Sequence, residues 1–238
     1  MEKYIGCSGF HYKDWKGKFY PESIAQGKWL SYYSDNFNSV EINNTFYKIP
    51  EHSTLKSWID QTPSEFRFSV KASRYITHMK KLKDSKIHVG KFYKSIDPLK
   101  KKLGAVLWQL PASFHRNDER IETFCRSLDN SFTNVIEFRH ISWFEEEVYN
   151  LISSFDVSFC SISAPGDLPE LIEDSTCKIY LRFHGKEEWY RYNYSNEELD
   201  KWKNEIVKSN ADICYIYFNN DYNAYAVENG IKMKELLS

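Results

Sequence analysis

The chain has 238 residues, enough for one large domain or two small ones, and 42% hydrophobic residues can fill a packed core. Its formal net charge of -1, from 32 basic and 33 acidic residues, argues against a generic nucleic-acid scaffold, which usually carries a basic excess. No apolar run approaches the roughly 18 residues that a membrane span requires.

The N-terminus and the cysteines both favour a cytoplasmic protein. Residues 1–6 lead directly into a strand-like run without the hydrophobic region of a signal peptide. The five cysteines show no C-x-x-C spacing, so we expect reduced, buried thiols rather than disulfides or zinc ligands. These residues are Cys7, Cys125, Cys160, Cys177 and Cys214.

Hydrophobic patterning predicts eight strands that mostly alternate with helices. The strands are expected at residues 4–7, 39–42, 66–71, 105–110, 135–138, 157–162, 178–183 and 213–218. Helices are expected at residues 28–36, 53–60, 91–101, 119–128, 142–153, 195–208 and 225–237, with a loop or broken helix over 74–82. Several helix starts carry capping signals, namely Ser53, Asn223, the pair Ser142 and Glu145, and the pair Ser195 and Glu198.

This alternation repeats at roughly 30 residues per unit, which predicts the α/β class and a single (β/α)₈ TIM barrel covering residues 1–238. An open doubly wound sheet is the alternative. It is disfavoured because no Gly-x-Gly-x-x-Gly follows any predicted strand. There is no linker, low-complexity segment or internal repeat, so we expect one domain.

In such a barrel, chemistry is carried by side chains at the C-terminal ends of the strands and in the loops that follow. Glu41 lies between Val40 and Ile42, so it points to the opposite face of its strand, which is the interior of a closed barrel. A carboxylate buried there requires partners. Other polar residues at strand ends are expected at the same mouth: Ser8, Asn43, Lys71, Gln109, Glu137, Arg139, Arg182, His184, Asn219 and Asn220.

The charges at this mouth allow a structural and a functional interpretation. As structure, Glu41 and Glu137 would neutralise the basic groups in an ion-pair network. As function, Lys71, Arg139, Arg182 and His184 would form a clamp for phosphate, sulfate or a carboxylate. The sum over these six groups is +1 with His184 neutral and +2 with it protonated, so we expect an anion at the mouth.

Other chemistries are conceivable for the same residues. Glu41, Glu137 and His184 have metal-ligand donors, but no H-E-x-x-H or close His pair supports a metal site. The two glutamates would suit a glycosidase-like acid/base pair if their separation were right. The aromatic run 189–194, which includes Tyr190, is either a lid that stacks on a base or sugar, or a cover packed on the rim.

A series of separated motifs runs nearly end to end, comprising residues 5–9 with Trp15, Gly17 and 19–21, then 40–47, 66–72, 75–78, 109–111, 137–140 with 142–144, 182–185, and 217–220. In these motifs the chain resembles the YecE-like family, a domain-of-unknown-function group of TIM-barrel proteins. The resemblance implies the barrel but little about activity, and a likeness in shape to DNA-repair endonucleases is analogy only. Many members carry an acidic residue at the end of strand six, where this chain has Ser163, which further weakens the metal interpretation.

Three functional hypotheses follow. The first is an enzyme acting on a small phosphorylated or otherwise anionic ligand, with Glu41 or Glu137 as general base and no cofactor. The second is a nucleic-acid-binding or endonuclease-like protein with aromatic stacking platforms, which the near-neutral charge disfavours. The third is a non-catalytic ligand-binding barrel. None of the three involves a membrane.

Overall fold

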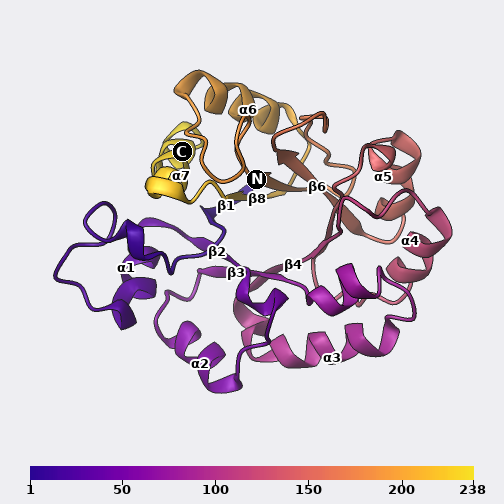
Figure 1. Cartoon of the computed structure of the whole chain (residues 1–238), viewed down its shortest axis with the longest axis horizontal. Coiled ribbons are helices and arrows are strands. Elements are labelled where there is room, and N and C mark those ends of the chain that lie inside the picture. The colour runs from indigo at the N-terminus through magenta and orange to yellow at the C-terminus, as the bar shows by residue number, and fades with distance from the viewer.

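The computed structural model describes residues 1–238 and contains eight parallel strands surrounded by helices (Figure 1). The strands are β1 (Glu2–Cys7), β2 (Ser39–Ile42), β3 (Arg67–Lys71), β4 (Leu103–Gln109), β5 (Asn134–Glu137), β6 (Val157–Ser163), β7 (Lys178–Phe183) and β8 (Ile213–Phe218). They form one sheet in the order β1-β8-β7-β6-β5-β4-β3-β2, which curls into a nearly closed barrel. The predicted (β/α)₈ barrel is confirmed.

The helices cover the outside of the sheet in chain order (Figure 1). They are α1 (Trp29–Asn36), α2 (His52–Asp60), α3 (Lys86–Ile96), α4 (Asp118–Cys125), α5 (Glu146–Ser153), α6 (Asn196–Lys208) and α7 (Tyr225–Leu236). No α-helix lies between β6 and β7. None of the helices is both long and apolar enough to cross a membrane.

The helix predicted over residues 91–101 is shifted in the structure. α3 begins five residues earlier, at Lys86, and ends at Ile96, and a separate 3-10 helix follows over Asp97–Lys102. Pro98 lies in the first turn of that second helix. Proline lacks an N–H and is tolerated at a helix start rather than in its interior, which explains why the two segments are separate.

Only one of the expected helix caps is present. Ser195 and Glu198 form a full capping box at the start of α6, as predicted. The caps predicted at Ser53, Ser142 and Asn223 are wrong. Ser53 lies inside α2, which begins at His52. The other two side chains have long-range partners that compete with capping: the Ser142 hydroxyl accepts from the backbone N–H of Arg116, and the Asn223 amide from the ammonium of Lys18.

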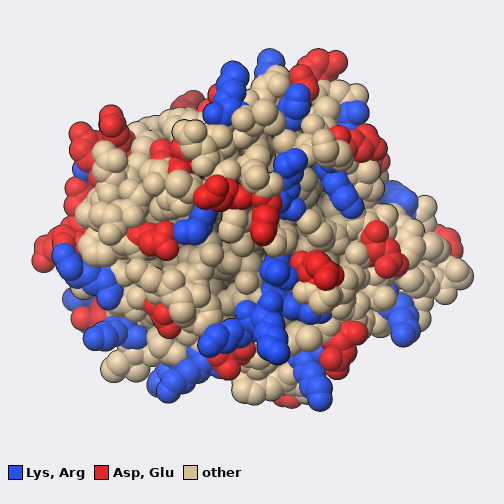
Figure 2. Space-filling model, turned by 180° about the vertical axis from the view of Figure 1, so that it is seen from behind, with Lys and Arg blue, Asp and Glu red and all other residues tan.

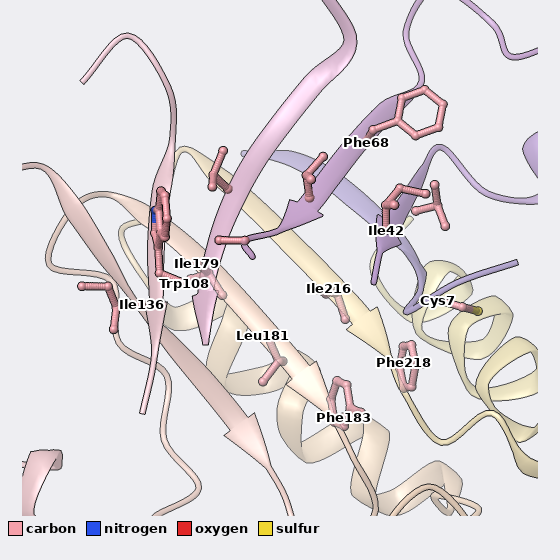
Figure 3. Packing of buried hydrophobic residues seen from close by; sticks show 14 of the residues in the cluster. Cys7, Ile42, Phe68, Trp108, Ile136, Ile179, Leu181, Phe183, Ile216 and Phe218 are labelled. Carbon is pink, nitrogen blue, oxygen red and sulfur yellow. The ribbon is translucent and has the colours of Figure 1, made fainter. Parts of the chain in front are cut away.

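Alternate residues of each strand face two different environments. The outward set packs against the helices, and Figure 3 shows Phe183 and Phe218 side by side in this layer, with their rings stacked at 4.5 Å. The inward set includes Tyr180, Tyr215 and Tyr217, which belong to a separate buried cluster inside the barrel. The interior therefore places hydroxyl groups directly below the charged residues of the mouth.

β1 and β2 are neighbours that share no backbone ladder, and side chains close the barrel between them. The hydroxyl of Tyr33 accepts from the N–H of Cys7 at 2.7 Å and donates to the carbonyl of Ser39 at 3.0 Å. The side-chain amide of Asn38 accepts from the N–H of Ile5 at 2.9 Å and donates to the carbonyl of Lys3 at 2.7 Å, both on β1. These two side chains act as the seam of the barrel.

Substituting Tyr33 by phenylalanine should lower the free energy of unfolding by about 1–3 kcal/mol, because a buried N–H and a buried carbonyl lose their partner. Tyr33 is fully buried, so no water replaces the hydroxyl at the surface. Urea denaturation at neutral pH measures the change. Tyr32→Phe, on the same helix and outside the seam, should change stability by far less. Equal stabilities for the two variants would contradict the assigned role of the seam.

The cysteines differ from expectation at one position. All five are free thiols, and four are buried, but Cys177 is exposed. It lies in the turn before β7 with a φ of +55°, so it is part of a surface connection rather than of a strand. The expectation that every cysteine is buried is therefore wrong for Cys177.

Candidate functional site at the barrel mouth

A buried arginine organises the C-terminal end of the barrel. Arg182 on β7 is 1% exposed and lies between Glu41 of β2 and Glu137 of β5, both fully buried. Its Nη2 donates to Glu41 Oε1 at 2.6 Å, and its Nη1 donates to Glu137 Oε2. Three strands thus bring three charges together inside the barrel, as the period-2 pattern implies. One guanidinium satisfies an oxygen of each carboxylate.

Tyrosine hydroxyls form the floor of this ion-pair network. The Tyr180 hydroxyl donates to the second oxygen of Glu41 at 2.7 Å. The Tyr217 hydroxyl lies 2.6 Å from Ser39 Oγ and 2.8 Å from Ser69 Oγ. Because buried polar groups are costly without hydrogen bonds, the Tyr180 hydroxyl supplies a partner to the Glu41 oxygen that Arg182 does not reach.

Arg139 and His184 extend the network toward the cavity. Arg139 Nε donates to Glu137 Oε1, and its Nη2 lies 2.9 Å from His184 Nε2. Since a guanidinium only donates, Nε2 of the imidazole accepts from Arg139, and the side-chain amide nitrogen of Asn219 lies 3.0 Å from Nδ1. Burial first, and then the arginines and Lys71, hold the pKa of His184 well below its usual range. His184 is therefore neutral, and the six-group sum is +1 rather than +2.

Glu137 is held as a carboxylate by its neighbours. Burial alone would raise its pKa, but Arg139, Arg182 and Lys71 outweigh burial and lower the pKa to about 2. A carboxylate with so low a pKa binds a proton weakly. Glu137 therefore serves the network as a counter-ion.

A cavity of about 390 Å³ opens above this network. Seven of the residues expected from the sequence line it, namely Asn43, Lys71, Gln109, Arg139, Arg182, Tyr190 and Asn219. Glu41, Glu137 and His184 lie behind that lining. Ser8 lines an adjoining cavity of about 330 Å³ that shares Asn43 with the first. Asn220 is buried and donates to the carbonyl of Tyr192 and to Asn229, both at 2.8 Å.

Lys71 differs from the other cations of the mouth. Neither glutamate lies within ion-pair distance of its ammonium, which makes no hydrogen bond and instead lies 4.4 Å from the centre of the Phe46 ring. Burial, followed by the nearby Arg182, lowers the pKa of Lys71 to about 8. The two arginines are committed to carboxylates, so Lys71 is the one unpaired cation among the residues lining the cavity.

The chain matches known proteins along nearly its whole length. A family model described as "Protein of unknown function DUF72" matches residues 4–238. The chain belongs to the DUF72 family. It is 31% identical to UPF0759 protein YunF of Bacillus subtilis over 98% of this chain and 94% of that protein. UPF0759 protein YecE of Escherichia coli is 33% identical over 51% of this chain and 46% of that one. The predicted YecE-like relationship is confirmed.

Two solved structures share the DUF72 fold. A DUF72 family protein from Thermotoga maritima superposes with a TM-score of 0.90 at 32% identity, covering 100% of this chain and 99% of that one. A second, from Enterococcus faecalis, has a TM-score of 0.86 at 20% identity, covering 99% of this chain and 95% of that one. Both support the barrel architecture described above.

The aromatic run after β7 forms part of the rim of the DUF72 mouth. The guanidinium of Arg139 lies 4.7 Å from the centre of the Trp189 ring, and the N–H of Tyr190 donates to the carbonyl of His184 at 2.7 Å. Gly185 makes the turn possible, since its φ is +103° and a Cβ there would lie 2.4 Å from the carbonyl of Glu188. The run is thus anchored to the network by a stacked cation and a backbone bond.

Sequence reasoning missed four lining residues: Tyr12, Phe46, Tyr47 and Asp221. Asp221 follows Asn219 and Asn220 in the loop after β8, so the rule that placed those two also applies to it. The aromatic residues gave no distinguishing signal, because the chain has 17 Tyr and 16 Phe, most of which serve the core.

A metal centre and a second depression are the alternatives to this cavity. No group of three or more His, Cys, Asp or Glu side chains is arranged to hold a metal ion. A larger depression of about 710 Å³ lies beside α6, where Lys186 pairs with Glu170 at 3.4 Å and with Glu198 at 3.2 Å. Most of its charges are already paired and it contains none of the mouth residues, so the smaller cavity is the better candidate.

Proposed function

We propose that the mouth of this DUF72 barrel binds a small anionic ligand, phosphorylated or carboxylated, through Lys71 and Arg139. The observation that carries this proposal is the unpaired ammonium of Lys71 in a cavity whose other cations already hold carboxylates. An anion would supply the charged partner that a partly desolvated ammonium lacks. Arg182 would hold Glu41 and Glu137 in place and so shape the cavity floor.

Binding is better supported than hydrolysis. The low pKa of Glu137 makes it a weak general base, since efficient bases have a pKa near the working pH. Both oxygens of Glu41 are engaged, one by Arg182 and one by Tyr180. We therefore place ligand binding first and a non-catalytic role ahead of hydrolysis. The buried, unlinked thiols favour a cytoplasmic location.

A single-stranded nucleic acid is the second candidate, favoured by one observation. The segment from the end of β3 to the first residue of α3 carries several cations that form no ion pair, and the Lys80 ammonium lies 5.9 Å from the centre of the exposed Tyr75 ring. These cations are Arg74, Lys80, Lys81, Lys83 and Lys86. On the face drawn in Figure 2, however, acidic side chains lie among the basic ones, so no surface of a single sign extends across it. A small anion fits this charge pattern better than a long polyanion.

Replacing Lys71 by methionine should weaken the binding of inorganic phosphate by roughly 10- to 150-fold, the equivalent of a charged hydrogen bond. Isothermal titration calorimetry at pH 7 measures the affinity. In the parent protein, affinity should fall as the pH rises through about 8, because Lys71 loses its charge there. Lys71→Met should show no such decline over the same range.

Lys56→Met is the matched control, because Lys56 is exposed on α2 and lies outside the cavity. It should bind phosphate as the parent does. Repeating the titration from 50 to 300 mM salt separates the candidates, since a polynucleotide loses affinity far more steeply with salt than a single small anion. Equal phosphate affinity for Lys71→Met and the parent would refute the proposal.

A further inference from the structure

Asp221 is the one carboxylate among the residues that line the cavity. Its backbone is fixed, because its carbonyl accepts from the indole of Trp15 at 2.9 Å and from the N–H of Ala224 at 3.2 Å. Its side chain, by contrast, forms neither an ion pair nor a hydrogen bond with another residue. The cavity thus presents one unpaired cation, Lys71, and one unpaired carboxylate, Asp221.

Lys71 and Asp221 line the same cavity, but no ion pair joins the ammonium to the carboxylate. Burial, with a smaller contribution from Asp14, raises the pKa of Asp221 to about 6. The opposite charges therefore do not neutralise one another. Each still requires a partner.

We propose that the ligand of this mouth carries a hydrogen-bond-donating group, an amine or a hydroxyl, that binds the carboxylate of Asp221 while its anionic group binds Lys71 and Arg139. The inference rests on the proposed function and narrows it to small zwitterionic or hydroxylated anions. A partly buried carboxylate without a partner is stabilised by a donor, most strongly by a charged one.

The cavity agrees with a ligand of this kind in size and lining. Its volume of about 390 Å³ lies at the lower end of the roughly 300–1,000 Å³ typical of small-molecule sites, which suits a metabolite of few carbon atoms. The uncharged part of the lining combines the amides of three residues with four aromatic side chains: Asn43, Gln109 and Asn219, and Tyr12, Phe46, Tyr47 and Tyr190. A plain inorganic anion would leave Asp221 and much of this polar surface without a partner.

The test compares three probes that share a phosphate monoester and differ at the other end: ethyl phosphate, glycerol 3-phosphate and phosphoethanolamine. Calorimetry at pH 7, where Asp221 is mostly ionised, should show that at least one donor-bearing probe binds about tenfold or more tightly than ethyl phosphate. If glycerol 3-phosphate shows the larger gain in affinity, the preferred donor is a hydroxyl. If phosphoethanolamine does, it is an amine. In Asp221→Asn this gain should shrink to about threefold or less.

Ethyl phosphate also serves as the folding control, because its affinity in Asp221→Asn should equal or exceed that in the parent once a nearby negative charge is removed. If ethyl phosphate binds and the three probes bind equally, the role of Asp221 is overturned and the anion site stands. The same conclusion holds if the donor-bearing probe still binds about tenfold more tightly than ethyl phosphate in Asp221→Asn. If none of the probes binds the parent protein, the anion site fails and this inference fails with it.

Discussion

Replacing Arg182 by methionine should lower the free energy of unfolding by about 3–5 kcal/mol, because the change leaves two buried carboxylates without their shared cation. Glu41 would retain the hydroxyl of Tyr180, and Glu137 would retain Arg139. For a chain of this size the loss corresponds to a fall in Tm of roughly 6–20 °C. Thermal and urea denaturation at pH 7 measure both quantities.

Arg191→Met is the control for this variant. Arg191 pairs with Glu188 at 3.2 Å on the surface, where both side chains are more than half exposed. Such pairs contribute at most about 1 kcal/mol, so the control should melt near the parent. If Arg182→Met melted with the control rather than well below it, Arg182 would not be the counter-ion that holds the mouth together.

Acid should destabilise the protein through Glu137. Its folded pKa of about 2 lies below the ordinary value of 4.5, so the unfolded state takes up a proton first as the pH falls. The resulting stabilisation, about 3 kcal/mol, is fully present above the ordinary value and is lost as the pH falls toward 2. Urea denaturation from pH 7 to pH 2.5 should therefore show stability declining below about pH 4.5.

Glu137→Gln separates this group from the other acids of the chain. The variant should be less stable at neutral pH and lose less of its stability between pH 4.5 and 2.5, because glutamine does not titrate. Glu122 lies exposed on α4, where it pairs with Arg126. Glu122→Gln should lose as much free energy of unfolding as the parent between pH 4.5 and 2.5. If Glu137→Gln lost as much free energy of unfolding as the parent over this pH range, the pKa of Glu137 would not be lowered in the folded protein.

The fold could be predicted because local pattern and global architecture agree. Each β-branched or aromatic run is short, and every run except the sixth is followed by a helical period, which only a few parallel topologies accommodate. The predictions that were wrong concern local details, such as helix caps, that depend on contacts with residues far away in the sequence. Ser142 has the spacing of a cap, yet its hydroxyl is taken by the N–H of Arg116 on another segment. The end of α3 at Ile96, by contrast, has a local cause, because Pro98 lies in the first turn of a second helix.

The candidate site could be predicted as a set of residues at one end of the barrel, but not as a set of pairs. Strand alternation indicates that Glu41 and Arg182 face inward, since it depends only on position along a strand. Which carboxylate each cation reaches depends on strand register, tilt and rotamer across the barrel. Lys71 and Arg139 look equivalent in the sequence, yet the structure pairs Arg139 with Glu137 and leaves Lys71 without an ion pair.

The seam between β1 and β2 has a consequence for the connectivity of the chain. Backbone pairing runs without interruption from β2 through β8 to β1 and stops there, so Tyr33 and Asn38 join the two edges of what is otherwise an open ribbon. The termini lie close together (Figure 1), and the ammonium of Lys3 donates to the carbonyl of Leu237. A circular permutant that linked the termini and began between β1 and β2 would therefore place all eight strands along the chain in their order across the sheet.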